Sequence, residues 1–327
     1  MFSRLSIFLF IVLATLSCKK EKSYQYIQGN ALGTTFSVKY DDLKNANYSA
    51  SIDSLFTVIN QSLSTYHSNS LISQINKGDT LVKVDQHFVN VFEKAKRIHQ
   101  ETDGAFDPTI GSLVNAWGFG PKKPLQNLDS ATVKSFMQLV GLDKVRLKNN
   151  TISKTNPDIF IDFNAIAKGY AVDVIGQFLE SKNCTNYMVE IGGEVRVRGI
   201  NAEGDFWRIG IEKPLTDGTR DLETAISLQN KSMATSGNYR KFKIDSLGNK
   251  FVHTINPKTG FTIQNDILSA SVISTKDCAD VDAYATAFMV MGFKKTTAFL
   301  ETHPELEVFL IYVNRNGETA ILNTEVI

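Results

Sequence analysis

The sequence predicts a single large α+β domain. Its 327 residues, of which 43% are hydrophobic, provide enough chain for a sizeable core. Helical patterns come first, strand patterns fill the middle, and a helix and a β-hairpin follow. This segregated order favours α+β over the alternating order of a doubly wound sheet. The composition excludes a disordered chain, a fibre and a multispan membrane protein, and the balance of 35 basic and 34 acidic residues argues against nucleic acid as a partner.

The N-terminal segment 1–17 has the pattern of an export signal. Arg4 precedes an apolar run that is shorter than the roughly 20 residues of a membrane-spanning helix. Cys18 and the polar residues KKEKS follow directly, as in a bacterial lipoprotein signal. We therefore expect a signal peptide at 1–17, a tether with a lipidated Cys18 at 18–23, and a folded domain at 24–327. The expected location is the extracytoplasmic (periplasmic) side of the bacterial cell membrane; the alternative is a plain secretory signal cleaved nearby.

Apolar residues at helical spacing predict helices at 51–64, 86–101 and about 279–302, with a further helix after Asp162. β-rich runs predict strands at 34–40, 157–163, 206–211, 225–228, 240–244, 251–255 and 268–274. Residues 188–198 alternate around Gly192–Gly193, which predicts two strand pieces and a sharp turn or bulge. Asn316–Gly317 predicts a hairpin between strands 306–314 and 318–322. Cys184 and Cys278 are expected to be buried thiols, with a disulfide between them as the alternative.

Two segments have the character of a ligand site. Residues 102–120, TDGAFDPTIGSLVNAWGFG, combine turn-rich backbone with the aromatic residues that a planar ligand needs, although a loop packed under its own aromatics would look the same. In 161–173, IDFNAIAKGYAVD, Lys168 lies in the first turn of the predicted helix. A lysine there opposes the helix dipole unless an anion is near, which favours a phosphate site over a solvated lysine.

Two further patterns carry possible catalytic groups. Asp282 and Thr286 are four residues apart on a predicted helix, and they offer hard oxygen ligands suited to Mg²⁺. The alternative is that Thr286 bonds back to its own helix. His253 lies on a predicted strand between the turn-rich, polar segments TSGNYR and NPKTG, where it is either a base or a surface or cross-strand residue. Gly192–Gly193, flanked by Glu190 and Glu194, is a bulge or a ligand's backbone seat.

Eight motifs in this order resemble the ApbE family of flavin transferases, from about residue 30 to 292. They are ALGTTFSVKY (31–40), STYHSNSLISQIN (64–76), the 102–120 and 161–173 segments, VEIGGEVRVRG (189–199), MATSGNYR, HTINPKTG and ADVDAYATAFMVMG. The resemblance implies a mixed, mostly antiparallel sheet with packed helices. It also implies FAD as substrate, Mg²⁺ as cofactor, and attachment of FMN through its phosphate to a Thr or Ser hydroxyl, with release of AMP. The implied acceptors are flavoprotein subunits of extracytoplasmic or membrane redox complexes.

Carried over residue by residue, the resemblance implies a metal site at the Asp282 carboxylate, the Thr286 hydroxyl and the Ala165 carbonyl. It implies His253 and Lys168 as catalytic residues, with His253 as the base. The implied flavin contacts are Leu32, Tyr66, Gly104, Ala105, Phe106, Asp162 and Lys168. The family's Asp-Pro-Arg-Thr-Gly turn is Asn-Pro-Lys-Thr-Gly here, which weakens a bidentate phosphate role for Lys258. Two alternatives stay open: an FAD pyrophosphatase that gives FMN and AMP, and a non-catalytic flavin-binding lipoprotein.

Overall fold

The computed structural model describes residues 23–42, 44–125, 128–215, 219, 221–238, 242–244 and 250–324. The predicted signal peptide, Cys18 and all but the last residue of the predicted tether lie outside these ranges. Residues 240 and 241 of the predicted strand 240–244 lie outside them as well. Within the described ranges, no helix is long and apolar enough to cross a membrane.

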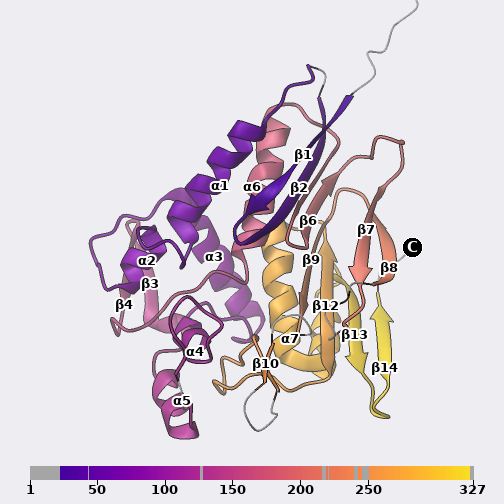
Figure 1. The fold of residues 1–327 in the computed structure, drawn as a ribbon. Coiled ribbons are helices and arrows are strands. Elements are labelled where there is room, and N and C mark those ends of the chain that lie inside the picture. Colours follow the sequence, from indigo (N-terminus) through magenta and orange to yellow (C-terminus); the bar gives the residue numbers. More distant parts are fainter. Residues whose placement is uncertain are drawn as a thin grey trace, which may run out of the picture.

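An eight-stranded sheet forms the centre of the fold (Figure 1). Its ladders are all antiparallel, which confirms the predicted α+β class. In spatial order, the strands are β1 (Ser23–Ala31), β2 (Thr34–Asp42), β5 (Tyr187–Ile191), β6 (Glu194–Arg198), β9 (Ser232–Gly237), β12 (Ile267–Ser274), β13 (Glu307–Val313) and β14 (Thr319–Asn323). Two-stranded ribbons are formed by β3 (Val145–Lys148) with β4 (Thr151–Lys154), β7 (Trp207–Glu212) with β8 (Leu222–Leu228), and β10 (Phe242–Ile244) with β11 (Lys250–Val252).

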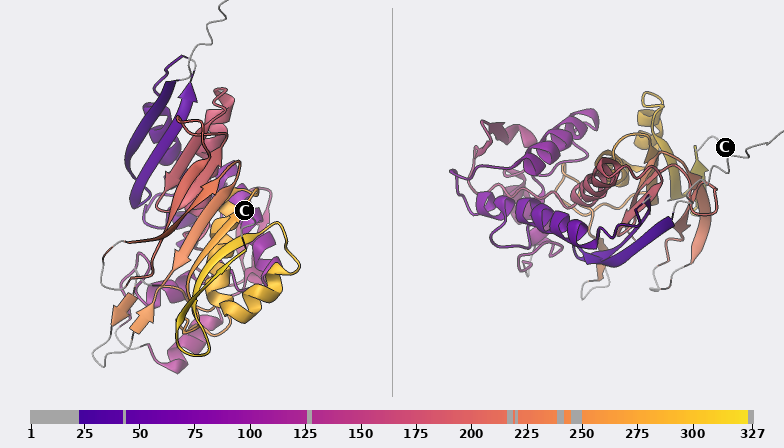
Figure 2. Two further views of the ribbon diagram at one scale, coloured as in Figure 1. Left: turned by 90° about the vertical axis from the view of Figure 1, so that its right-hand side faces the viewer. Right: turned by 90° about the horizontal axis from the view of Figure 1, so that it is seen from above.

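The central sheet is covered differently on its two faces (Figure 2). The long helices pack on one face around the larger core: α1 (Ser49–Leu63), α3 (Gln86–Glu101), α6 (Ala167–Ser181) and α7 (Cys278–Leu300). The β7–β8 ribbon covers part of the other face, where Trp207 and Ile209 pack with Val195 and Ile273. The short helices are α2 (Leu71–Asn76), α4 (Gly111–Ala116) and α5 (Ser130–Met137), followed by a 3-10 turn at Leu142–Lys144. Because successive side chains of a strand point to opposite faces of the sheet, neighbouring residues of one strand contribute to different hydrophobic cores.

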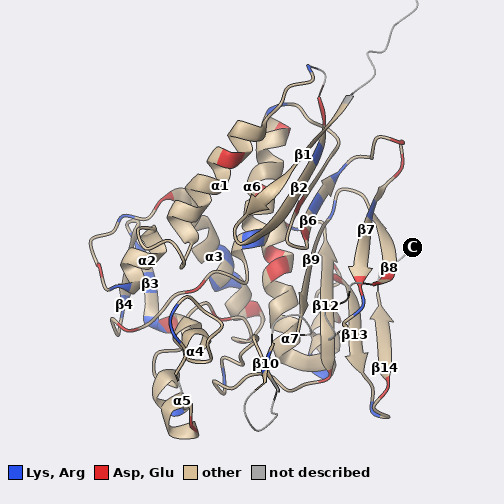
Figure 3. Cartoon of the chain, in the orientation of Figure 1, with Lys and Arg blue, Asp and Glu red and all other residues tan. Residues whose placement is uncertain are grey.

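Ion pairs between charged side chains also connect helices within the helical layer. Basic positions on α3 lie beside acidic positions on α7 (Figure 3). Lys94 and Arg97 both pair with Asp280, at 3.1 and 2.8 Å. These ion pairs fix α3 against the first turn of α7. The two cysteines Cys184 and Cys278, both within the described chain, are buried thiols and no disulfide joins them, so the disulfide alternative is wrong.

The four predicted helices are confirmed, but the predicted strand at 157–163 is wrong. That segment starts in a turn at 157–158, and it forms a single isolated bridge from Phe160 to Ile110. Side chains take the place of a ladder. The Lys154 ammonium donates to the carbonyls of Pro157 and Ile159, and the Asn76 amide bonds both backbone groups of Ile161 at 2.8 Å. The backbone is satisfied without a partner strand.

Two further predictions need correction around the segment 233–260. The start of TSGNYR, predicted as turn-rich, continues strand β9 through Gly237 in register with β12. His253 lies directly after β11, which ends at Val252, and not on a strand. The turn predictions are confirmed: Gly192, Gly193 and Gly317 adopt φ values of 62°, 106° and 81°, which glycine reaches without strain.

Candidate active site

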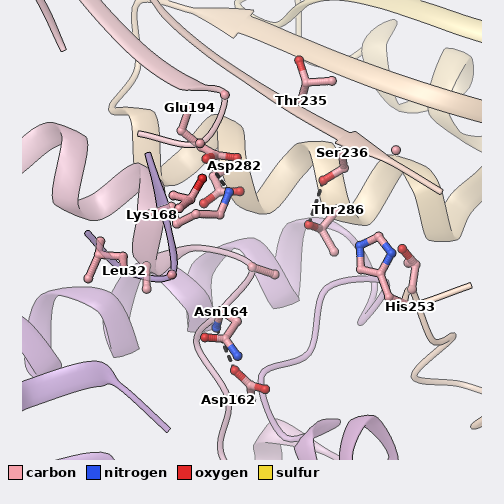
Figure 4. A pocket seen from close by; sticks show the side chains of 18 of the residues that line it. Leu32, Asp162, Asn164, Lys168, Glu194, Thr235, Ser236, His253, Asp282 and Thr286 are labelled. Carbon is pink, nitrogen blue, oxygen red and sulfur yellow. Dashed lines mark hydrogen bonds and ion pairs between the residues drawn. The ribbon is translucent and has the colours of Figure 1, made fainter. Parts of the chain in front are cut away.

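A cavity of about 1210 Å³ lies between the helical layer and strands β7 and β9. Its lining comes from segments far apart in the sequence, several of which Figure 4 shows in place. The volume exceeds the 300–1,000 Å³ that is typical of pockets for drug-sized molecules. The lining contains the predicted site residues Leu32, Tyr66, Ala105, Phe106, Asp162, Ala165, Lys168, His253, Asp282 and Thr286.

Gly104 is the predicted site residue that does not line the cavity. It has a φ of 72°, and its N–H donates to the His99 carbonyl at 2.8 Å. A Cβ at this position would lie 3.4 Å from the His99 ring. Gly104 therefore turns the chain so that Ala105 and Phe106 reach the cavity, which is a role in shaping the loop.

Asp282 and Thr286 lie on the cavity side of α7, as their spacing predicts. The Asp282 carboxylate is buried, with 4% of the residue exposed, and its Oδ2 accepts a hydrogen bond from the Gly169 N–H at 3.0 Å. The Thr286 hydroxyl lies 3.2 Å from the Ser236 hydroxyl, which contradicts the alternative in which it serves only its own helix. Burial raises the pKa of Asp282, and the nearby Lys168 opposes that rise.

The oxygens at this end of the cavity suit a hard divalent cation. Asp282 brings a carboxylate that is held at one oxygen by a backbone N–H, and Thr286 brings a hydroxyl one helical turn further along. Ala165 lines the same cavity in the turn before α6, where its carbonyl is a third oxygen donor. This donor set consists of hard oxygens, which Mg²⁺ prefers over nitrogen or sulfur ligands. The residues present therefore fit the cation that the sequence predicts.

Lys168 lies in the first turn of α6, as predicted, and forms an ion pair with Glu194. Glu194 is the first residue of β6 and is 2% exposed. The anion that the lysine needs at this helix start is therefore a carboxylate of the chain itself, and a bound phosphate is not required. Burial works to lower the pKa of Lys168, but Glu194 and Asp282 outweigh it and raise the pKa; burial raises the pKa of Glu194.

Glu194 is the main site residue that sequence reasoning missed. The pattern offers a weak signal, because a glutamate directly follows Gly192–Gly193, the turn that the sequence predicts as a bulge or a ligand's backbone seat. The structure shows that the turn brings the side chain inward from β6 toward the start of α6 (Figure 4). Gly193 N–H also donates to the Glu190 carboxylate at 2.8 Å, which fixes the turn.

Asp162 lies across the cavity from Asp282, Lys168 and Glu194 (Figure 4). Its Oδ1 accepts a hydrogen bond from the Asn164 N–H at 2.8 Å, and its own N–H donates to the Pro108 carbonyl. Burial raises the pKa of Asp162 to about 6. Tyr66, by contrast, is 61% exposed at the cavity rim, so the flat face of its ring is open to a planar partner.

The 102–120 segment, predicted as turn-rich, contains helix α4 at Gly111–Ala116, and it meets both expectations for its aromatic residues. Phe106 and Phe119 line the cavity, and the Phe119 ring meets the His253 ring edge-on with centroids 6.4 Å apart. Trp117 packs away from it, against Phe251, with its indole N–H donating to a backbone carbonyl at residue 260. The loop thus packs partly under its own aromatics and partly presents them to the cavity.

The turn 256–260 is fastened to the same loop. Lys258 forms an ion pair with Asp103, and both side chains are more than half exposed. An exposed pair of this kind contributes little to stability. Its consequence is that Lys258 points to the loop and is not among the residues that line the cavity.

These observations define a class of protein: a large α+β domain with a large pocket that is lined by aromatic side chains and by oxygen donors suited to a cation. Comparison with known proteins gives the family. The sequence model of the ApbE family matches residues 32–310. The chain belongs to the ApbE family.

Relatives extend this match over nearly the whole chain. The FAD:protein FMN transferase of Haemophilus influenzae is 37% identical over 320 residues, covering 94% of this chain and 92% of the relative. The FAD:protein FMN transferase of Vibrio cholerae is 34% identical over 313 residues, covering 94% and 92%. The solved structure of the flavin transferase ApbE from Vibrio cholerae superposes with a TM-score of 0.82 at 33% identity, covering 93% of this chain and 98% of that one.

Proposed function

We propose that this protein is an FAD:protein FMN transferase. It cleaves the pyrophosphate of FAD and attaches FMN through its phosphate to a threonine or serine hydroxyl of an acceptor protein. The acceptor oxygen forms a bond to the FMN phosphorus while the bond from that phosphorus to the AMP oxygen breaks, so AMP leaves. The observation that carries the proposal is the shared cavity, which brings Asp282, Thr286, Lys168 and His253 together with Tyr66 and Phe106.

A Mg²⁺ ion would be held by the Asp282 carboxylate, the Thr286 hydroxyl and the Ala165 carbonyl. When bound, it supplies positive charge to the pyrophosphate, where negative charge develops as the bond breaks. The Gly169 N–H fixes one oxygen of Asp282 and so orients the carboxylate before any cation arrives. Lys168, at the start of α6, adds a positive charge at the same end of the cavity.

The remaining side chains bind the flavin and handle the proton. His253 lines the cavity beside the aromatic loop, where its imidazole can accept the proton of the acceptor hydroxyl. Tyr66 offers a flat face to the flavin ring, and Leu32, Phe106 and Asp162 bound the same space. Gly104 shapes the loop that carries Ala105 and Phe106. Enclosure of the phosphorus by these residues limits attack by water, which would turn transfer into hydrolysis.

We further propose that Cys18 carries a lipid anchor on the extracytoplasmic side of the membrane. The apolar run before Cys18 and the polar tether after it support this location. The acceptors would then be flavoprotein subunits of extracytoplasmic or membrane redox complexes. A Cys18→Ser variant should leave the membrane fraction, and retention there would contradict the anchor.

The decisive experiment incubates the purified protein with FAD, Mg²⁺ and a candidate acceptor domain. AMP release and in-gel flavin fluorescence on the acceptor are followed together. AMP with a fluorescent acceptor band supports the transferase. AMP and free FMN without a labelled band, for an acceptor that a related transferase does label, would replace it with the pyrophosphatase. Bound FAD without any AMP would leave a flavin-binding lipoprotein.

A further inference from the structure

Glu194 has no place in the mechanism above, yet it lies at the centre of the charged cluster. The cluster consists of two buried carboxylates, Glu194 and Asp282, on either side of the Lys168 ammonium (Figure 4). Glu194 comes from β6, Asp282 from α7 and Lys168 from α6, so the three groups sit on three separate elements. Among the described residues that line the cavity, Lys168 is the only lysine.

Stability does not explain the Lys168–Glu194 pair. A buried ion pair gains little net free energy, because desolvation of the two charges offsets their attraction. The lysine also sits in the first turn of α6, where the helix dipole favours an anion over a cation. The pair therefore has its main effect on where the ammonium is held.

The position of the Lys168 ammonium matters because the next residue in the chain is bonded to Asp282. Gly169 follows Lys168 directly, and its N–H is hydrogen-bonded to Asp282. The lysine side chain is long and rotatable, and Asp282 lies beside it in the cluster (Figure 4). If Glu194 were uncharged, Asp282 would be the nearest remaining carboxylate for this ammonium within the cluster. Pairing there would set the ammonium in competition with a cation for the same oxygens.

We propose that Glu194 is a positioning residue that holds the Lys168 ammonium on the β6 side of the cavity and away from Asp282. The Asp282 carboxylate is thereby kept available for a divalent cation. The inference rests on the proposed function in one respect, the assignment of Asp282 as a ligand of that cation.

A double-mutant cycle tests the proposal by direct cation binding. Mn²⁺ serves as the probe, and free Mn²⁺ is measured by electron paramagnetic resonance during titration of the full chain in detergent. The proteins are wild type, Glu194→Gln, Lys168→Met and the double variant. We expect Glu194→Gln to weaken Mn²⁺ binding at least tenfold when Lys168 is present and less than threefold when Lys168 is methionine. Equal weakening in both backgrounds, or none in either, would overturn the proposal.

Two controls separate the possible causes of failure. Glu212→Gln removes a carboxylate from another wall of the same cavity and should change binding less than threefold; a tenfold change would show a general charge effect and overturn the proposal. Asp282→Asn should abolish binding. If it binds Mn²⁺ as wild type does, the metal assignment fails and the inference fails with it, whereas loss of binding together with an additive cycle refutes only the role of Glu194.

A conservative variant keeps the test usable if Glu194→Gln does not fold. Glu194→Asp retains the charge but shortens the side chain by one methylene. It should weaken Mn²⁺ binding in the same direction and to a smaller extent, again only when Lys168 is present. Weakening by Glu194→Asp in the Lys168→Met background would contradict the proposal, and circular dichroism establishes the folding of each variant.

Discussion

Gly169 offers the most direct test of how the cation site is assembled. A Cβ on this residue would lie 2.4 Å from the Cys278 carbonyl oxygen and 2.8 Å from the Ala279 Cα, both of which are backbone atoms at the start of α7. Ordinary contact distances begin near 3.4 Å, so Gly169→Ala must move α6 and α7 apart by about 1 Å. The same movement stretches the hydrogen bond from the Gly169 N–H to Asp282, which now spans 3.0 Å.

The expected cost combines two effects. Overpacking costs about 1–3 kcal/mol, and loss of the bond to the buried Asp282 carboxylate adds about 1–3 kcal/mol. A displacement of about 1 Å at the site should also lower AMP release from FAD on the order of a hundredfold. Urea unfolding and an AMP assay measure the two effects separately.

The matched control is Gly176→Ala on the same helix. There the added Cβ would lie 3.1 Å from the Arg196 Cδ and from the Tyr187 hydroxyl, and its nearest neighbours include no backbone atom of α7. Alanine also favours the helix, so this variant should keep both stability and activity. If Gly169→Ala retained AMP release within threefold of wild type and unfolded at the same urea concentration, the close contact between α6 and α7 would not be needed for the site.

Three further predictions concern the opposite end of the cavity and the base. Because burial raises the pKa of Asp162 from 3.8 to about 6, its ionised form costs the folded state about 3 kcal/mol at pH 8, and this cost disappears as the pH falls through 6 toward 3. Asp162→Asn should therefore gain unfolding free energy relative to wild type at pH 8 and lose that gain at low pH; a difference independent of pH would contradict the burial argument. Asn76→Ala should lose about 1–3 kcal/mol in urea unfolding because both backbone groups of Ile161 lose their partner, and an unchanged midpoint would show that water replaces the amide. His253→Ala should lower transfer about a hundredfold or more with an FAD Kd within threefold of wild type, and equal losses in both would argue against a base.

The helices could be predicted from the sequence because their apolar residues recur at helical spacing. The helix predicted at 86–101 has these bounds in the structure, and its apolar residues Phe88, Val91, Phe92, Ala95 and Ile98 are all buried. Strand prediction failed where the deciding partners lie outside the predicted segment. Nothing in 157–163 reveals that Lys154 and Asn76 will satisfy its backbone. Likewise the Thr-Ser-Gly end of β9 has turn-forming residues, and only its register with β12 makes it a strand.

The candidate site shows the same division. Asp282 and Thr286 could be paired from sequence because one helix fixes their relative position through a spacing of four residues. Glu194 could not be assigned to Lys168, because their contact depends on how β6 packs against the start of α6. Gly104 was expected to touch the ligand, since a motif does not distinguish a residue that lines a cavity from one that turns the chain toward it.

The start of α6 explains why so much of the site comes from one short segment. Besides Lys168 and the Gly169 N–H, this helix provides Asp173, which is 2% exposed. The Asp173 carboxylate accepts hydrogen bonds from the backbone N–H groups of Cys278 and Ala279, both at 2.8 Å, and so caps α7 from a neighbouring helix. Arg196 pairs with the same carboxylate at 2.7 Å and balances its buried charge. Helix α6 thus holds the first turns of α7 at two points, the cap and the Gly169 contact. Because Asp282 lies about one helical turn beyond the cap and is hydrogen-bonded to the Gly169 N–H, α6 helps to set its position, and the segment 161–173 acts as the frame on which the oxygen ligands are assembled.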